Sequence, residues 1–376
     1  MAISLPSPVG DGVDLLVIAG EHSGDQHAAA MVREMLAQRP GLRVAALGGH
    51  ELAAAGAQLL HDLTASSVVG FVEVVPKIPY FRALHKATLA WIGTHQPKAV
   101  VFVDYPGFNL RLAADLKEKG ISRKGGGKVS TLFYISPQIW AWKAGRRFKM
   151  AKILDALAVI FPFEVDCYKD TELPVSFVGH PFLAPGYQAP VSYDPQGPVL
   201  LLPGSRRGAV RRIFPDLIAA YRALEPKRPA VVIHPSEAVR QVLEAARPPE
   251  GIELRPTGSP VAASAVLTSS GTMSMHCALA GIPGCVVYRT NPLTYLFGRM
   301  LVKTRFIGIA NLLLDRAMYP EFIQDAARPD VLAKQLQACL GDPARIAATA
   351  ADAEALRASL RRPASGTAAD WVLARL

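Results

Sequence analysis

The stretch DLLVIAGEHSGDQHAAAMVREMLAQ, residues 14–38, contains one complete strand–turn–helix unit. Its mainly apolar residues 14–19 predict a buried strand, and its amphipathic residues 27–38 predict a helix. The small residues Gly20 and Gly24 favour a tight turn between them. Such units build parallel sheets buried on both faces, because each helix returns the chain to the start of the next strand.

The same alternation of short apolar runs and amphipathic stretches continues on both sides of a linker. Residues 183–198, LAPGYQAPVSYDPQGP, are crowded with Pro, Gly and polar residues, which favours a domain boundary. We therefore predict an α/β fold of two doubly wound, Rossmann-like domains facing a central cleft, with ligands outside the carboxyl ends of the strands. The predicted parts are α/β domains at residues 1–185 and 195–345, followed by terminal helices at residues 346–376.

The composition favours anionic partners and a reducing compartment. The chain has 376 residues, half of them apolar, and a net charge of +10, which suits phosphates, anionic lipid or nucleic acid. No nucleic-acid-binding pattern is present, so we expect no nucleic acid partner. We expect a cytoplasmic protein with at most a peripheral membrane contact, because neither a secretory signal nor a long apolar run is found. The widely spaced cysteines lack a zinc-type pattern: Cys167, Cys277, Cys285 and Cys339.

Polar residues follow two predicted strands of the first half. Glu21, Ser23 and Gly24 stand where a helix begins, a position suited to phosphate or sugar hydroxyls. An equal alternative is a plain tight turn with Ser23 or Asp25 as N-cap. Asp104 ends the apolar run AVVFVD, where a carboxylate can act as a general base or can cap the Pro-Gly turn that follows.

Two turns in the second half have the composition of a diphosphate site. A Gly-Ser turn followed by arginine offers N–H donors and a planar guanidinium, and a helix N-terminus favours a nearby anion by about 0.3–1 kcal/mol. Neither a GK[ST] ending nor GxGxxG is present, so we expect neither ATP hydrolysis nor a nicotinamide cofactor. The candidates are Gly204, Ser205 and Arg206 in the first turn and Ser270, Gly271 and Thr272 in the second.

Taken in order, these motifs resemble those of the bacterial lipid-A-disaccharide synthases, glycosyltransferases with the two-domain GT-B fold. The similar stretches include AGEHSGD, VDYPGFNLRLA, YISPQIWAWKAGRRFK, FPFE, FVGHP, LLPGSRRG, SSGT, NLLLDR and PEFIQ. The resemblance implies an inverting transfer from UDP-2,3-diacylglucosamine onto 2,3-diacylglucosamine 1-phosphate (lipid X), giving a β-1,6-linked disaccharide and UDP. It further implies that no metal ion or cofactor is needed.

The resemblance also assigns roles to the domains and their residues. The first domain is expected to bind the acceptor and the membrane, the second to bind the nucleotide sugar, and the terminal helices to return to the first domain. Asp104 becomes the general base, and Arg206 would hold the UDP diphosphate. The remaining expectations are Gly204, Ser205, Ser270, Gly271, Thr272, His276, Tyr288 and Asn311 at the nucleotide sugar, and Glu21, Ser23, Gly24, Gln138 and Trp140 at the acceptor or donor sugar.

Two positions depart from the family pattern. The family commonly has Glu after SGTxxL, where the carboxylate accepts two ribose hydrogen bonds, but this chain has His276. A neutral imidazole can accept only one such bond, so UDP recognition is expected to be weaker or differently arranged. Gly107 replaces a second family aspartate, and the role of that aspartate does not transfer.

The segment FYISPQIWAWKAGRRFKM, residues 133–150, places two tryptophans before a basic run. Because both implied substrates carry acyl chains, we expect this segment to lie at the cytoplasmic surface of the inner membrane. Trp140 is expected to face the site, and residues 78–93, which interleave aromatic and basic side chains, to reach the same lipid layer. The expected membrane residues are Trp142, Lys143, Arg146, Arg147 and Lys149, each cation adding roughly 1 kcal/mol near anionic lipid.

Other interpretations stay open at this point. A UDP-N-acetylglucosamine 2-epimerase has the same fold and would need further acids or histidines, for which His22, His180 and His276 are available. A catalytically silent lipid- or nucleotide-binding protein is favoured if His276 marks lost donor binding. A homodimer through the apolar residues 293–301 is a further hypothesis, although that stretch suits a core equally well.

Overall fold

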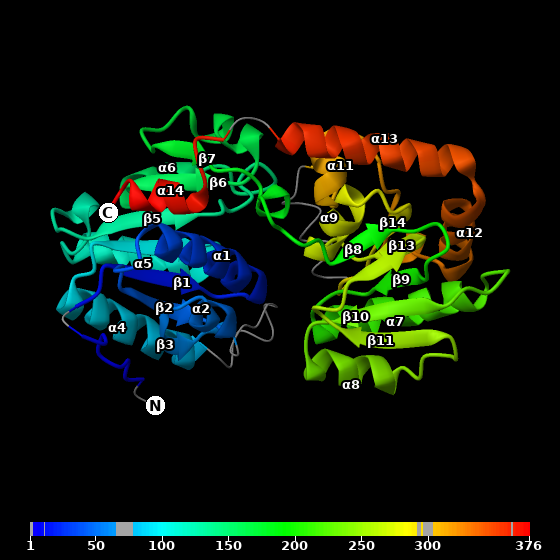
Figure 1. Ribbon diagram of the computed structural model, residues 1–376, viewed down its shortest axis with the longest axis horizontal. Helices are drawn as coiled ribbons and strands as arrows, with labels where there is room; N and C mark the ends of the chain where they lie inside the picture. Colours follow the sequence, from blue (N-terminus) through cyan, green and yellow to red (C-terminus); the bar gives the residue numbers. More distant parts are fainter. Residues whose placement is uncertain (1–2, 11, 65–77, 292–294, 296–303, 362–363) are drawn as a thin grey trace. The chain divides into compact units, whose positions relative to one another are not determined.

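A computed structural model describes all of the chain except residues 1–2, 11, 65–77, 292–294, 296–303 and 362–363. The chain forms two compact units, each a parallel sheet with helices packed against it (Figure 1). Unit 1 comprises Met1–Pro181 together with Arg361–Leu376, and unit 2 comprises Phe182–Leu360.

The sheet of unit 1 has, in the described part of the chain, seven parallel strands in the order β3-β2-β1-β4-β5-β6-β7. The order reverses between β1 and β4, which makes this pair the topological switch point of the sheet. The strands are β1 Leu15–Ala19, β2 Val44–Gly48, β3 Gln58–Asp62, β4 Ala99–Val103, β5 Ser130–Tyr134, β6 Ala156–Val159 and β7 Val175–Phe177.

The helices of unit 1 pack in two groups. Helix α1 contacts α2 and α14, and α5 contacts α4 and α6 (Figure 1). The 3₁₀ turn η4, Pro162–Glu164, follows β6. The helices are α1 His22–Gln38, α2 His50–Ala54, α4 Ile78–His95, α5 Pro106–Glu118, α6 Arg146–Ile153 and α14 Ala368–Leu373.

The larger sheet of unit 2 has six parallel strands in the order β11-β10-β9-β13-β14-β15, counted over the described residues. Its order reverses between β9 and β13, so this unit has a switch point of the same kind. A small separate sheet pairs β8 Val191–Tyr193 with β12 Val261–Ala263. The strands are β9 Val199–Leu202, β10 Ala230–His234, β11 Ile252–Pro256, β13 Ala265–Thr268, β14 Gly284–Tyr288 and β15 Glu321–Ile323.

The helices of unit 2 also form two groups. Helix α7 contacts α8 and α12, whereas α9, α11 and α13 contact one another. The short 3₁₀ turn η6, Pro181–Leu183, spans the point in the sequence where unit 1 gives way to unit 2, and η7, Gln324–Ala326, follows β15. The helices are α7 Arg207–Arg222, α8 Glu237–Ala245, α9 Thr272–Leu279, α11 Ile309–Leu314, α12 Pro329–Gly341 and α13 Pro343–Leu360.

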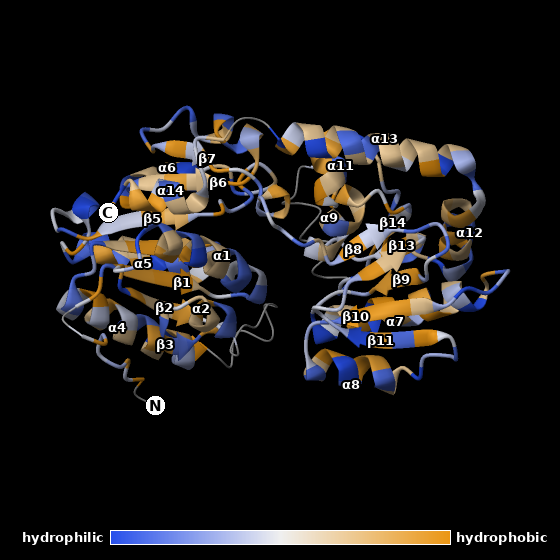
Figure 2. Ribbon diagram, in the orientation of Figure 1, coloured by the Kyte–Doolittle hydropathy of each residue, from blue (hydrophilic) through white to orange (hydrophobic). Residues whose placement is uncertain are grey.

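Each unit has its own hydrophobic core between the sheet and the helices. The central strands are coloured as hydrophobic in Figure 2, and strands β1, β4 and β9 are buried along their whole length. Phe102 and Phe133 belong to the core of unit 1 and Phe214 to that of unit 2, each fully buried. Burying a side chain of this size contributes roughly 1.5–3 kcal/mol, so the sheet centres provide a rigid base for the loops that leave them.

The C-terminal segment is divided between the units. Helix α13 belongs to unit 2 and packs on α9 and α11 through buried residues that include Leu356. Helix α14 belongs to unit 1, where Gln38 Nε2 donates to Asp370 Oδ1 over 2.9 Å and Thr367 Oγ1 donates to Glu34 Oε1 over 2.7 Å. The expected return of residues 346–376 to the first domain therefore describes only the chain after Leu360.

Candidate active site

The loops after β1 and β4 lie next to each other at the switch point of unit 1, because these strands pair in parallel with Ala19 opposite Val103. Helix α1 begins at His22 directly after Glu21, and no side chain caps its N-terminus. The N-cap expected at Ser23 or Asp25 is therefore wrong. Asp25 is instead fully buried and accepts hydrogen bonds from the backbone N–H groups that begin α2.

The backbone at Asp104 is held in an unusual conformation. Asp104 and Tyr105 have φ angles of 47° and 48°, in the left-handed region that costs a residue with a side chain free energy. The buried Asn109 stabilises this turn, since its Nδ2 donates to the carbonyl oxygen of Asp104 over 2.8 Å. No side chain caps α5, so the structure gives Asp104 no capping role there. The strained turn places Asp104 directly after the last residue of β4, at the carboxyl edge of the sheet.

The environment of Asp104 makes its carboxyl more basic than usual. Burial raises the pKa of Asp104 to about 6, the negative charge of Glu21 adds to the rise, and a backbone hydrogen bond from Tyr105 opposes it. The same two causes, burial first and then Glu21, raise the pKa of Tyr105 to about 12. Glu21 and Asp104 thus form a pair of interacting carboxyls at one edge, an arrangement found where groups exchange protons.

The loops after β5 and β6 contain Trp140 and Glu164, and Glu164 was not among the site residues predicted from the sequence. Gln138 is exposed and Trp140 half-buried in the loop after β5, where both were expected at a sugar. The indole Nε1 of Trp140 donates to Glu164 Oε1 over 3.2 Å. Glu164 is 1 % exposed, and burial above all raises its pKa to about 8. Its motif FPFE was noted in the sequence, but neither the burial of the carboxyl nor its bond to Trp140 could be read from that motif.

The switch point of unit 2 carries the two turns predicted for a diphosphate. Strands β9 and β13 pair in parallel with Leu202 opposite Thr268, so both turns leave the same edge side by side. Helices α7 and α9 begin after Arg206 and Gly271, and neither N-terminus has a side-chain cap. Gly204 adopts a φ of 114°, which only glycine adopts readily. The exposed candidates are Ser205, Arg206, Gly271 and Thr272, with Ser270 half-buried.

The imidazole of His276 lies inside an aromatic stack. The Phe182 ring is stacked on it with centroids 3.8 Å apart, and Tyr187 Oη lies 3.3 Å from His276 Nε2. Only 7 % of His276 is exposed. A residue expected at the ribose is therefore covered by the segment that opens unit 2.

Asn311 is also committed to contacts within unit 2. Its Nδ2 donates to the Tyr319 carbonyl oxygen and to Glu321 Oε1 over 2.6 and 2.8 Å, and its Oδ1 accepts from the Tyr319 N–H over 2.9 Å. Both amide N–H groups are thus used, so a nucleotide contact would have to involve the remaining acceptor capacity of Oδ1. Tyr288, at the end of β14, is half-buried beside Arg289, whose Nε lies 2.5 Å from Asp216 Oδ2.

The basic and aromatic segment after β5 exposes two rings covered by cations. Trp142 and Phe148 are 40 % and 47 % exposed. Lys143 and Arg146 lie over the Trp142 ring, with Lys143 Nζ 4.5 Å from its centroid. Lys149 is exposed. Arg147 covers Phe148 but also forms a two-bond ion pair with Asp170, at 2.7 and 2.6 Å, so its charge is already compensated.

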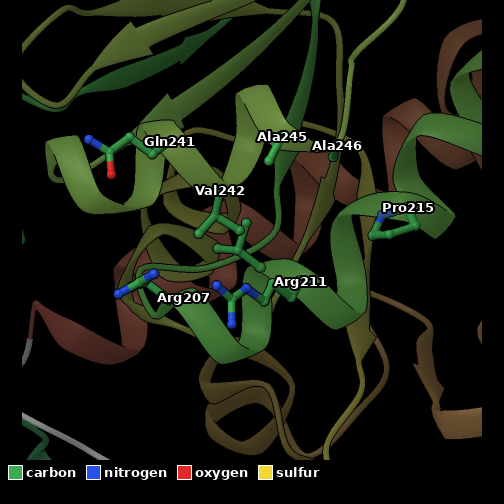
Figure 3. Close-up of a pocket in the computed structure, with 8 residues that line it drawn as sticks. Arg207, Arg211, Pro215, Gln241, Val242, Ala245 and Ala246 are labelled. Atoms are coloured by element: carbon green, nitrogen blue, oxygen red, sulfur yellow. The ribbon is translucent and has the colours of Figure 1, made fainter.

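A surface cavity of about 280 Å³ lies between α7 and α8 (Figure 3). None of the candidate site residues described above lines it. Arg207 and Arg211 line it from α7, and Val242 lines it from α8. Within the described residues, no three His, Cys, Asp or Glu side chains gather as a metal site would require. None of the helices described has the length and hydropathy needed to cross a bilayer. Most of the proposed dimer stretch, residues 293–301, falls outside the described residues.

Comparisons with known proteins agree with this arrangement. A sequence model of the lipid-A-disaccharide synthetase family matches residues 15–374. Lipid-A-disaccharide synthase 1 of Legionella pneumophila (strain Philadelphia 1) is 35% identical over 346 residues, 88% of each chain. A UDP-GlcNAc 2-epimerase from Neisseria meningitidis, solved with UDP-GlcNAc, aligns with a TM-score of 0.59 and 11% identity over 93% of this chain and 100% of that one. The calicheamicin glycosyltransferase CalG4 aligns with a TM-score of 0.57 and 17% identity, over 97% of this chain and 98% of that one.

The two Rossmann-like units, each with polar loops at its switch point, define a protein of the GT-B class, as predicted. The structural likenesses at such low identity establish the fold alone. Within that class the chain belongs to the lipid-A-disaccharide synthase family, whose members are hexosyltransferases of lipid A biosynthesis. The epimerase alternative is not retained, because its similarity is limited to the fold whereas the family match spans residues 15–374.

Proposed function

We propose that this chain condenses UDP-2,3-diacylglucosamine with 2,3-diacylglucosamine 1-phosphate, releasing UDP and the β-1,6-linked disaccharide 1-phosphate. The observation that carries the proposal is the carboxyl of Asp104 at the switch point of unit 1, with its pKa raised to about 6. Such a group is ionised at neutral pH yet more basic than an ordinary aspartate, which suits a general base. Unit 1 accordingly takes the acceptor and unit 2 the nucleotide.

In the proposed step, Asp104 takes the proton of the acceptor 6-hydroxyl while that oxygen attacks the anomeric carbon of the donor. The bond from this carbon to the β-phosphate oxygen breaks, and its electron pair stays on UDP. Because attack occurs opposite the leaving group, the configuration at the carbon inverts. The half-buried position of Asp104 supports this role, since a partly desolvated carboxylate binds a proton more strongly than one in water.

The two turns of unit 2 would stabilise the negative charge that develops on UDP. The exposed guanidinium of Arg206 can bind phosphate oxygens through two parallel hydrogen bonds. The uncapped N-terminus of α9 offers the N–H groups of residues that begin with Thr272. These fixed donors supply the positive potential that the leaving group needs, so we propose a transfer that requires no metal ion.

Peripheral binding to the cytoplasmic surface of the inner membrane is part of the proposal. The exposed rings of Trp142 and Phe148, each beneath a cation, support it because aromatic rings and basic side chains both partition to the headgroup layer. The acyl chains of both substrates would then remain in lipid while their sugars reach unit 1.

The test is release of UDP by the purified chain with both acylated substrates in detergent and EDTA. We expect UDP and a disaccharide phosphate only when both substrates are present, and a loss of roughly 100- to 10,000-fold in kcat for Asp104→Asn. Asp325→Asn, an exposed aspartate in η7, removes the same charge away from both switch points and should behave as wild type. A wild-type chain that binds the lipids without releasing UDP would instead establish the silent binding protein.

A further inference from the structure

Three strand ends bring Asp104, Trp140 and Glu164 to one edge of unit 1. Strand β5 lies between β4 and β6, with Val103 paired to Tyr134 and Tyr134 paired to Ala158. Asp104 follows β4, Trp140 follows β5 and Glu164 follows β6. Because the strands are parallel, all three residues lie beyond the same carboxyl edge, in neighbouring loops.

Glu164 is a buried carboxyl whose two oxygens have different partners. Its Oε2 accepts the backbone N–H of Phe161 over 3.2 Å, which closes the turn η4. Its Oε1 accepts the indole N–H of Trp140, which comes from another loop. Within the described residues no Lys, Arg or His forms an ion pair with Glu164. Burying a carboxyl without a cation is costly, and closing one turn requires only one of its oxygens.

The ring of Trp140 is fixed at its edge while part of it stays open to solvent. Its Nε1 is held by Glu164, and Phe163 packs against it edge to face with centroids 5.4 Å apart. Phe163 in turn stacks on Phe161, and the centroid of the Phe161 ring lies 5.3 Å from that of the His180 ring. The indole is half-buried, so the aromatic cluster holds it in one orientation without covering it.

We infer that Glu164 is a positioning residue for the acceptor: it holds the Trp140 indole as a fixed platform on which a pyranose ring stacks beside Asp104. The sugar presents C–H groups to the ring face, and its hydroxyl points toward the base. The inference rests on the function proposed above and names how the acceptor sugar is recognised. A fixed indole lowers the ordering cost of binding, so its loss should weaken acceptor binding more than it slows the chemical step.

The first experiment compares steady-state kinetics of the wild-type chain, Trp140→Phe and Glu164→Ala. Each variant loses the indole–carboxyl bond, and we expect the KM for 2,3-diacylglucosamine 1-phosphate to rise roughly tenfold while kcat changes less than about threefold. The KM of the double variant should not exceed the higher KM of the two single variants, because both substitutions remove the same interaction. Glu164→Gln keeps an oxygen acceptor and should recover part of the affinity.

The control is Trp91→Phe, which also removes an indole hydrogen bond of unit 1, the one to the Pro6 carbonyl oxygen at 2.8 Å. It should leave the acceptor KM unchanged. If Glu164 only closes its turn, Glu164→Ala will lower the melting temperature while Trp140→Phe keeps the wild-type KM, and the inference fails. Additive effects in the double variant also overturn it. An inactive wild-type chain in the same assay overturns the proposed function itself.

Discussion

Glu21 and Asp104 follow two neighbouring parallel strands, and the negative charge of Glu21 helps to raise the pKa of Asp104. Burial is the larger cause, and together they bring the pKa to about 6. The carboxyl of one loop therefore helps to set the pH at which the carboxyl of the next becomes a base.

Replacing Glu21 with Gln should shift the pH dependence of transfer. The pKa of Asp104 should fall, because its carboxylate no longer faces a second anion. The acid limb of kcat/KM, expected near pH 6 in the wild type, should therefore move to lower pH. A pH–rate profile checks this, with Glu118→Gln at the exposed end of α5 as the control. An unmoved acid limb would mean that the charge of Glu21 does not act on Asp104.

Gly20→Ala should disturb the turn that carries Asp104. A methyl group at Gly20 would lie 2.2 Å from Tyr105 Cδ1, so the ring would have to move. We expect a loss of about 1–3 kcal/mol in unfolding free energy, together with reduced transfer. Urea unfolding and the UDP assay measure both effects. Gly107→Ala, where the methyl meets nothing within 4 Å, is the matched control, and equal stability of the two variants would contradict the prediction.

Asn311→Ala should destabilise unit 2 more than it weakens UDP binding. The change leaves the backbone of Tyr319 and one bond to Glu321 without their partner, at a cost of about 1–3 kcal/mol. Chemical unfolding and calorimetric titration with UDP separate the two effects. A normal unfolding free energy with UDP affinity reduced tenfold would favour the nucleotide role expected from the sequence.

Charge reversal at Lys143 and Lys149 should weaken binding to anionic vesicles by more than tenfold, since each cation contributes roughly 1 kcal/mol near such a surface. Lys334→Glu on α12 is the control for the same charge change elsewhere. Replacing both Arg147 and Asp170 with Ala should have a smaller effect than either lysine change, because their ion pair carries no net charge. Flotation with vesicles at low and high salt measures the difference. An equal loss of vesicle binding in the Lys334→Glu variant would mean that the net charge of the protein, and not this segment, causes the effect.

The stability of unit 1 should fall as Glu164 ionises. Its pKa is raised from 4.5 to about 8, so the folded state binds this proton more tightly than the unfolded chain. The resulting stabilisation is fully present below pH 4.5 and is lost as the pH rises through 8. Glu164→Gln has no such proton. Its unfolding free energy should depend less on pH over this window, and identical pH profiles would refute the assignment.

The positions of the chemical loops could be predicted because they depend on a local pattern. Asp104, Arg206 and Gly271 each follow an apolar run, and parallel strands deliver such residues to one edge. The spatial order of the strands leaves no local trace, so neither switch point could be located from the sequence.

Residues whose role depends on a distant partner were placed less well. Glu164 becomes notable through its burial and through its bond to Trp140, 24 residues away in the chain. The imidazole of His276 was expected at a ribose, yet the ring of Phe182 stacks on it. These two residues are far apart in the sequence, and a hydrophobic pattern predicts only local structure, so this contact could not be predicted. Helix α13 and helix α14 look like one helical tail by composition, although they belong to different units.

The return of α14 to α1 affects how the protein is synthesised. More than three hundred residues separate Gln38 from Asp370, so the ribosome completes all of unit 2 before the last helix of unit 1 emerges. Until then, the surface of α1 that will contact α14 stays exposed on the nascent chain. Unit 2 is contiguous in sequence and can fold first, whereas unit 1 can be completed only after α14 has been synthesised.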